Sequence, residues 1–187
     1  MQIRTRLGMS IDGFIASPDG RPAFLAMPGF SPHSSYDWPA FDAQCDAVVM
    51  GRVPLEAGLG ASEWPWPGKQ IFVLTSKPLP DGIPADVVVA DDTPAGLLAK
   101  LRAAQLGGDA FLLGGQRTLQ AFLALGAIDR LEILELPVLL GEGVPLSPPG
   151  APQVALHLEE HRTFPDGTVH AVYTPNGLRT EPDLNRS

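Results

Sequence analysis

A strand that passes through two glycines into a helix is the feature that most constrains how this chain can fold. The apolar run Ala110–Leu113 is bounded by glycines and predicts a buried strand. Leu119, Phe122 and Leu123 follow at spacings of three and four, which predicts one buried face of a helix. Between these two elements, Gly114-Gly115 lets the backbone turn sharply and approach a ligand closely.

The first turn of the predicted helix is open to an anion. Gln116, Arg117 and Thr118 include no acidic residue, although acids are favoured near the N-terminus of a helix. The free backbone N–H groups of such a turn can bind a phosphate. A tight strand-to-helix turn with a solvated Arg117 is the simpler explanation of these residues when they are taken alone.

Short apolar runs alternate with helical segments through the middle of the chain, which predicts an α/β fold. We expect a largely parallel sheet with helices on both faces. Pro165-Asp166-Gly167 joins two alternating runs and predicts a C-terminal antiparallel hairpin. The predicted strands cover residues 2–10, 47–50, 71–74, 87–89, 109–113, 128–140, 153–164 and 168–173.

We expect a single domain over residues 1–175 and a polar, flexible tail over residues 176–187. Repeated prolines between Arg21 and Tyr36 predict a long loop. Asp37 is suited to cap a short helix that extends through Cys45.

The charge balance excludes some classes of partner. The chain has 13 Lys and Arg against 21 Asp and Glu, a net charge of −8. We therefore expect neither a nucleic-acid nor a membrane partner, because both require a basic surface. Cys45 is the single cysteine, which rules out a disulfide framework. No signal peptide or long apolar span is evident, so we expect a cytoplasmic protein.

Three predicted strands end in small or polar groups, namely Gly51-Arg52, Thr75-Ser76-Lys77 and Gly114-Gly115. Parallel strands would bring these ends to one edge of the sheet, beyond which α/β proteins bind ligands. Backbone N–H groups, a guanidinium, hydroxyls and an ammonium suit a phosphorylated nucleotide. Neither G-x-G-x-x-G nor G-x-x-x-x-G-K-[ST] is present, which argues against a standard dinucleotide-binding fold or a P-loop enzyme.

Four segments resemble, in order, the motifs of the dihydrofolate-reductase-like superfamily. The resemblance extends from about Gln2 to Tyr173. It is closest to the branch related to the reductase domain of bifunctional riboflavin-biosynthesis proteins. The segments are Met9–Ala16, Val49–Arg52, Leu113–Gly115 and Pro137–Gly143.

This resemblance implies an NADPH-dependent reductase with a mixed eight-stranded sheet, commonly a homodimer. It also implies a cis peptide between the two glycines. The family pattern assigns three groups of cofactor-binding residues: Gly51, Arg52, Thr75 and Ser76 around the adenosine 2′-phosphate; Gly114, Gly115 and Gln116 at the pyrophosphate; and Gly8, Ile15 and Ala16 at the nicotinamide.

Three positions depart from the family pattern. Pro54 stands where a threonine is frequent, Leu113 where the riboflavin-pathway enzymes usually have an acid, and Phe14 where they often have a basic residue. These departures argue against the phosphorylated pyrimidine of riboflavin biosynthesis as the substrate, while leaving the cofactor unchanged.

Hydride transfer to a C=N or C=O group requires a proton, which an acid or a bound water supplies. Asp37 is the candidate catalytic acid and Asp42 the other choice, although an N-cap role also explains Asp37. Three tryptophans are suited either to stack on a flat substrate or to pack beside loops, namely Trp38, Trp64 and Trp66.

The segment from His157 to His161 matches the zinc pattern H-x-x-E-H, which requires a helix. Apolar and polar residues alternate here, which predicts a strand. On a strand, residues four apart are separated by roughly 13 Å. We therefore expect no metal site.

The combined interpretation is an NADPH-dependent reductase of a small heterocyclic or carbonyl substrate. Dihydrofolate reductase and a nucleotide-binding protein without turnover are the alternatives. We also expect a homodimer, because Ile128–Leu140 has more apolar residues than a solvated edge strand should have.

Overall fold

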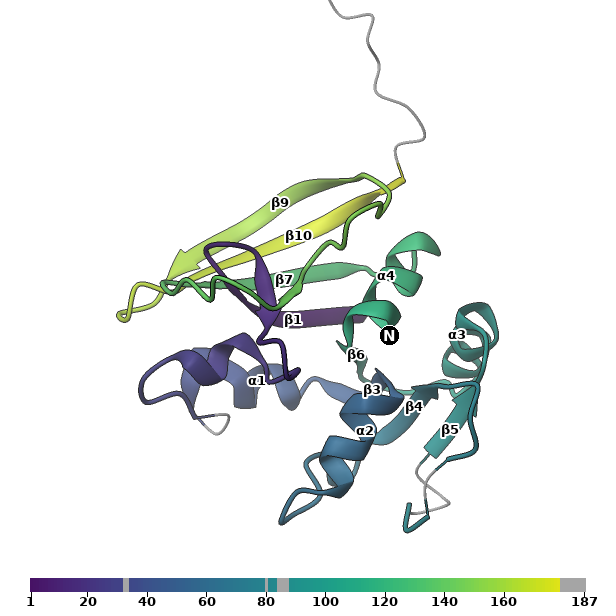
Figure 1. The fold of residues 1–187 in the computed structure, drawn as a ribbon. Helices are drawn as coiled ribbons and strands as arrows, with labels where there is room; N and C mark the ends of the chain where they lie inside the picture. The colour runs from purple at the N-terminus through teal and green to yellow at the C-terminus, as the bar shows by residue number, and fades with distance from the viewer. Residues whose placement is uncertain (32–33, 80, 84–87, 179–187) are drawn as a thin grey trace, which may run out of the picture.

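An eight-stranded sheet runs through the computed structural model, which describes residues 1–187 except 32–33, 80, 84–87 and 179–187 (Figure 1). Its strand order is β5-β4-β3-β6-β1-β7-β10-β9. A separate pair joins two short strands, β2 (Phe14–Ala16) and β8 (Val144–Pro145). The bounds of the main strands are β1 (Ile3–Ser10), β3 (Cys45–Gly51), β4 (Gln70–Leu74), β5 (Val88–Asp91), β6 (Asp109–Gly114), β7 (Arg130–Leu136), β9 (Val154–Thr163) and β10 (Val169–Leu178).

The sheet is parallel from β5 to β7, and β10 and β9 add an antiparallel hairpin at one side. Helices cover both faces. Two of them, α3 (Pro94–Ala103) and α4 (Gln116–Ala124), bury leucines and Phe122 against one face. The other two, α1 (Trp38–Asp42) and α2 (Arg52–Leu59), bury Phe41 and Leu55 against the opposite face. The predicted α/β fold is therefore confirmed.

The position of β7 corrects one sequence-based argument. β7 lies between β1 and β10, inside the sheet. Its apolar residues, such as Leu131, Ile133 and Leu134, are buried by their neighbours. Neighbouring strands rather than a second copy of the chain therefore bury these apolar residues, so they do not argue for a homodimer, and the outer strands are β5 and β9.

The loop predicted between Arg21 and Tyr36 contains two short 3-10 helices, η1 (Ala23–Ala26) and η2 (Ser35–Asp37). Helix α1 ends at Asp42 rather than at Cys45, because Cys45 begins β3. Strand β10 includes residues 176–178, and the remainder of the predicted tail lies outside the described residues. Across the part of the chain that the structure describes, no helix is long and apolar enough to cross a membrane.

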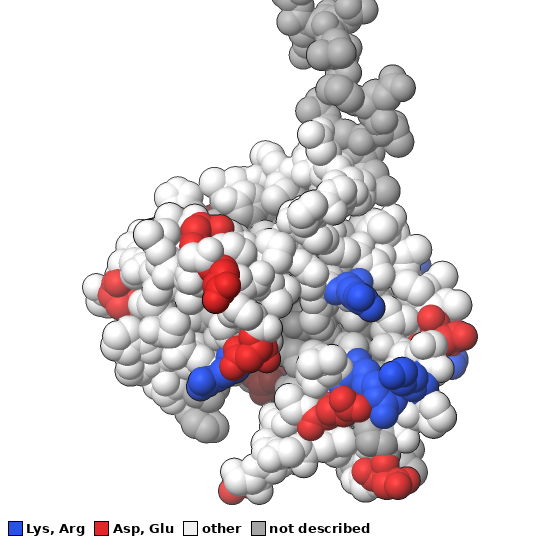
Figure 2. All heavy atoms as spheres, in the orientation of Figure 1, with Lys and Arg blue, Asp and Glu red and all other residues white. Residues whose placement is uncertain are grey.

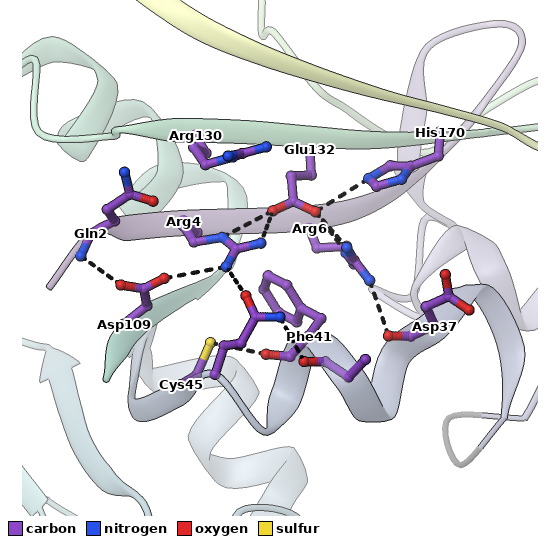
Figure 3. A network of polar contacts seen from close by, with 12 residues as sticks. Gln2, Arg4, Arg6, Asp37, Phe41, Cys45, Asp109, Arg130, Glu132 and His170 are labelled. Atoms are coloured by element: carbon purple, nitrogen blue, oxygen red, sulfur yellow. Dashed lines mark hydrogen bonds and ion pairs between the residues drawn. The ribbon is translucent and has the colours of Figure 1, made fainter. Parts of the chain in front are cut away.

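A buried carboxylate joins β1 to β7 and β10. Glu132 on β7 is 1% exposed, and its oxygens accept hydrogen bonds from the guanidinium groups of Arg4 and Arg6. The shortest N···O distance to each arginine is 2.6 Å. His170 on β10 lies 3.2 Å from the same carboxylate (Figure 3). Two buried cations are thus held by a hydrogen-bonded anion, the arrangement in which buried charges are tolerated.

The same arginines extend this contact to the helix layer. Their guanidinium carbons lie 4.9 Å (Arg4) and 4.3 Å (Arg6) from the ring centre of Phe41 in α1, within cation–π range. Arg4 also donates to Gln44 and to Asp109, at 2.6 and 3.2 Å. The network therefore connects the sheet, the end of α1 and the start of β6 (Figure 3).

Arg6 also binds the backbone just before α1. Tyr36 and Asp37 both adopt left-handed backbone conformations, with φ of 56° and 53°, which are uncommon for such residues. Arg6 donates to both of their carbonyl groups, at 3.1 and 3.4 Å. The Tyr36 hydroxyl donates to Asp166 in the turn between β9 and β10, at 2.7 Å. The approach to α1 is thus tied to the sheet at two points.

Burial would raise the pKa of Glu132, but the hydrogen bond from His170 and the interactions with both arginines outweigh it. They lower that pKa from an ordinary value of 4.5 to about 2. Because the folded pKa lies below the unfolded one, the ionised carboxylate stabilises the fold at neutral pH. This stabilisation is lost as the pH falls from about 4.5 toward 2.

We expect Glu132→Gln to lower the free energy of unfolding at pH 7 by about 3 kcal/mol or more, because two buried guanidinium groups lose their counter-charge. Glu135→Gln, on the exposed side of the same strand, is the matched control and should change it by less than about 0.5 kcal/mol. Urea denaturation measures both. Below pH 4.5, Glu132→Gln should lose less stability than the unchanged protein. Similar losses for the two variants at pH 7 would contradict the assignment.

Candidate functional site

Four parallel strands end at one edge of the sheet, and the predicted ligand-binding segments follow them there (Figure 1). In spatial order, β4 ends at Leu74, β3 at Gly51, β6 at Gly114 and β1 at Ser10. The structure therefore brings Gly51-Arg52, Thr75-Ser76-Lys77 and Gly114-Gly115 to the same edge, as the sequence predicts.

β1 and β6 separate before they reach this edge. In the described strands, β1 pairs with β6 only at Ile3 and Arg4, whereas it follows β7 from Arg4 to Ser10. On its other side, β6 follows β3 up to the pairing of Met50 with Gly114. The strand order also reverses here, because the chain runs outward through β3, β4 and β5 and returns through β6. Ligands of α/β proteins bind beyond such a reversal.

The glycine turn leaves open space beside this gap. The peptide bond between Gly114 and Gly115 is cis, as the family resemblance implies, and Gly114 has a φ of 108°. No described atom outside the turn lies within 4 Å of the Cβ position of either glycine. Gly115 is exposed and begins α4 without a side-chain cap. The first N–H groups of α4 are therefore open to an anion.

Helix α2 starts beside α4 in the same way. Gly51 precedes it without a side-chain cap, and a Cβ on Gly51 would lie 2.9 Å from the Thr118 hydroxyl of α4. Pro54 in the first turn of α2 has no N–H, so this turn offers one donor fewer. Helix α3 differs, because the Thr93 side chain accepts a hydrogen bond from Gly96 N and caps it.

Arg52 joins α2 to the turn that follows β4. Its guanidinium donates to the carbonyl group of Pro78 and, at 2.6 Å, to the carboxylate of Glu56. The Thr75 hydroxyl accepts from the Lys77 N–H at 3.2 Å and shapes this turn, on which Ser76 is exposed. Figure 2 shows Lys and Arg side chains gathered where Figure 1 places α2 and β4, although the net charge is −8.

The short β2–β8 pair carries Ile15 and Ala16 to the start of α4. Ala16 pairs with Val144 of β8, and the Gln116 side chain donates to the carbonyl of Pro145 at 2.7 Å. The Gln116 amide is therefore engaged within the protein. Ile15, Ala16 and Gln116 are brought together, as expected for residues around one ligand.

Asp12 links the first motif, Met9–Ala16, to the fourth, Pro137–Gly143. Its carboxylate accepts hydrogen bonds from the N–H groups of Leu140 and Gly141, at 3.1 and 2.7 Å. Hydrogen bonds from Ser10 and from these backbone groups hold the pKa of Asp12 below its usual range. Gly143, with a φ of 151°, lies so close to the Ala16 carbonyl that no side chain would fit.

Gly8 is buried and closely packed, unlike the open glycine turn. A Cβ on Gly8 would lie 3.0 Å from the Phe24 ring and 3.2 Å from Leu136. Phe24 belongs to an aromatic group with Phe30 and Trp38, at ring-centre distances of 4.5 and 5.9 Å. Figure 2 shows the surface hollowed between the part of the molecule that carries α1 and the part that carries α2.

The four motifs thus meet at one edge in the order that the family resemblance requires. The model of the family described as RibD C-terminal domain matches residues 2–170. The chain belongs to the RibD C-terminal domain family. The uncharacterized protein YyaP of Bacillus subtilis is similar, with 27% identity over 181 residues that cover 91% of this chain and 93% of YyaP.

Solved structures of RibD-like proteins share the fold. A protein from Shewanella sp. PV-4, assigned provisionally to riboflavin biosynthesis, superposes with a TM-score of 0.78 at 26% identity, over 94% of this chain and 99% of its own. The diaminohydroxyphosphoribosylaminopyrimidine deaminase/5-amino-6-(5-phosphoribosylamino)uracil reductase of Thermotoga maritima gives 0.63 at 12% identity, over 93% of this chain and 56% of its own. These likenesses confirm the dihydrofolate-reductase-like fold.

Within this RibD-type fold, the Asp37 carboxylate is engaged by a cation of the C-terminal hairpin. This carboxylate is 54% exposed and pairs with Arg162 of β9 at 2.5 Å, and it makes no N-cap hydrogen bond. Along one row across the sheet, Arg162 of β9 pairs with His170 of β10. His170 pairs with Leu134 of β7, and Leu134 pairs with Gly8 of β1. Arg162 thus lies three strands from β1, but its side chain reaches Asp37, whose carbonyl also accepts a hydrogen bond from Arg6 of β1.

The remaining candidates have structural roles. Asp42 pairs with Lys69 at the end of α1, at 3.2 Å. The Trp66 ring packs over Gly58 of α2, and Trp64 donates to the Trp66 carbonyl at 3.1 Å. Trp38 is half-buried in the aromatic group, whereas Trp64 and Trp66 pack on each other and on α2. The segment from His157 to His161 lies on β9, which confirms that it is a strand.

Sequence reasoning missed several residues that assemble this RibD-type site. Gln120 lies on α4 and donates to the Leu146 carbonyl at 2.9 Å. In the sequence, Asp12 stands within the segment Met9–Ala16 and has no distinguishing signal of its own. Glu56 carried a recognisable signal, because it follows Arg52 by four residues within a helix, where side chains meet.

We expect Gly115→Ala to remain folded but to bind NADPH, the cofactor that the resemblance implies, at least tenfold more weakly, about 1.4 kcal/mol. Its φ of −61° is ordinary for alanine, and the added methyl would enter the open space at the start of α4. Gly60→Ala, at the far end of α2, is the matched control. Cofactor titration and circular dichroism on the same samples decide this. If NADPH affinity were unchanged while stability fell strongly, Gly115 would be required only for the turn between β6 and α4.

Proposed function

We propose that this protein is an NADPH-dependent reductase of a small flat heterocycle or a related carbonyl compound. The separation of β1 from β6 beside the open glycine turn is the observation that carries this proposal. A gap between parallel strands offers unpaired backbone donors and acceptors to a planar amide, and the start of α4 offers N–H groups to a pyrophosphate. NADPH, when bound, supplies the hydride.

Different residues of the chain are assigned to different parts of the cofactor, as the RibD pattern suggests. Arg52 and the turn after β4 would hold the 2′-phosphate, and their contact through Pro78 supports this pairing. The start of α4 would hold the pyrophosphate. The nicotinamide would meet backbone groups of β1 and β2. The residues assigned are Gly8, Ile15, Ala16, Gly51, Arg52, Thr75, Ser76, Gly114, Gly115 and Gln116.

A flat substrate suits the aromatic group of Phe24, Phe30 and Trp38 beside Gly8. The Thermotoga relative is named for a uracil that carries a phosphoribosylamino group, and we infer a related heterocycle for this chain. Leu113 packs against the apolar cluster beneath α2 and offers no charge to such a substrate. The Asp37 carboxylate is paired with Arg162, so we infer that water in the cleft supplies the proton.

The proposal predicts a preference between nicotinamide cofactors. NADPH should bind more tightly than NADH, by roughly fivefold or about 1 kcal/mol, because Arg52 and Ser76 would meet the 2′-phosphate. Titration of both cofactors by tryptophan fluorescence measures the two affinities. Equal affinities would remove Arg52 from its assigned role, and no binding of either cofactor would reject the reductase.

A substrate panel then separates the remaining possibilities. Oxidation of bound NADPH by heterocyclic or carbonyl compounds is the expected result. Turnover of dihydrofolate alone would identify the alternative enzyme, dihydrofolate reductase. NADPH binding without turnover of any compound would favour a nucleotide-binding protein.

We also propose that the protein is a homodimer that joins through β9. This strand is ten residues long and lies at the outer edge of the sheet, where unpaired strands invite a partner. Leu156 and Leu158 are 42% and 44% exposed on it. An antiparallel register that sets Glu159 opposite Arg162 of a second copy also sets Glu160 opposite His161, so the strand complements itself.

Leu158→Asp should therefore convert a dimer to a monomer at micromolar concentration, because it places a charge in the contact. Leu139→Asp is the matched control, since Leu139 is 69% exposed and lies outside β9. Light scattering coupled to gel filtration measures the masses. A monomer mass for the unchanged protein would reject the proposal.

A further inference from the structure

The Arg52–Glu56 ion pair is not explained by the needs of its helix. Arg52 is the first residue of α2, and its Nε donates to Glu56 Oε1 at 2.6 Å. A cation in the first turn opposes the helix dipole. The order from arginine to glutamate along the helix is also the less stabilising one for such a pair. The ion pair is therefore better explained by the ligand-binding edge of the sheet, where Arg52 lies, than by the stability of α2.

The ion pair leaves only some N–H donors of the Arg52 guanidinium available to a ligand. A guanidinium has five N–H donors. Within the described residues, Arg52 uses Nε toward Glu56 and one terminal nitrogen toward Pro78. The Pro78 contact fixes the guanidinium beside the exposed residues Ser76 and Lys77. An anion at this place would meet the remaining N–H groups and would share the guanidinium with a carboxylate.

We infer that Glu56 limits how strongly this protein distinguishes NADPH from NADH. This inference rests on the proposed function, in which the 2′-phosphate binds at Arg52. A phosphate monoester carries a charge of about −1.5 to −2 at pH 7. A carboxylate on the same guanidinium would lie roughly 6 Å from it, where like charges repel appreciably even in water. NADH lacks the phosphate and meets no such repulsion at Arg52.

Glu56→Gln isolates the charge, because glutamine keeps the length of the side chain and an oxygen that accepts from Arg52 Nε. NADPH affinity should rise about threefold at 0.15 M ionic strength, and further at lower salt. NADH affinity should stay the same. Glu63→Gln is the matched control, since Glu63 is an exposed carboxylate beyond the C-terminal end of α2. It should leave both affinities unchanged.

The measurement is the ratio of NADPH to NADH affinity for the three proteins at two salt concentrations, with circular dichroism to establish folding. A salt-dependent rise in this ratio for Glu56→Gln alone supports the inference. An unchanged ratio overturns it. Weaker NADPH binding by Glu56→Gln also overturns it, and would mean that the ion pair holds Arg52 in place. If the unchanged protein binds neither cofactor, the proposed function itself fails.

Discussion

The contact between Glu132 and the two arginines of β1 is the interaction on which the rest of the structure depends. It places a charged cluster against the Phe41 ring, where Arg4, Arg6 and Glu132 are all buried. The cluster also determines how α1 approaches the sheet, because Arg6 holds the backbone just before that helix. Apolar packing alone would not specify this approach, since it lacks direction.

The same cluster explains how the site stays open. β1 is attached firmly to β7 along its length, so it can leave β6 after Arg4 without losing its place in the sheet. Glycines then occupy the positions where backbone from different strands comes close, and Asp12 attaches the loop that closes the edge. This edge of the sheet is therefore shaped chiefly by backbone rather than by side chains.

Local patterns predicted most of the fold. The run from Asp109 to Ala124 contained its own strand, turn and helix signals, and the structure has all three. Features that depend on distant pairing could not be predicted. Arg4, Arg6 and Glu132 each stand among apolar residues with strand alternation, but only the register between β1 and β7 shows that they meet. The place of β7 inside the sheet, and the contact of Asp37 with Arg162, depend on strand order in the same way.

The central position of β1 has a consequence for synthesis on the ribosome. Its partners are residues 110–111 and 130–136, so β1 is made well before either strand with which it pairs. At about 5–20 residues per second, it waits on the order of ten seconds for β7. The strands from β3 to β5 are close in sequence and can associate earlier. Arg4 and Arg6 put two charges on one side of this unpaired strand, and such charges counter aggregation of hydrophobic strands.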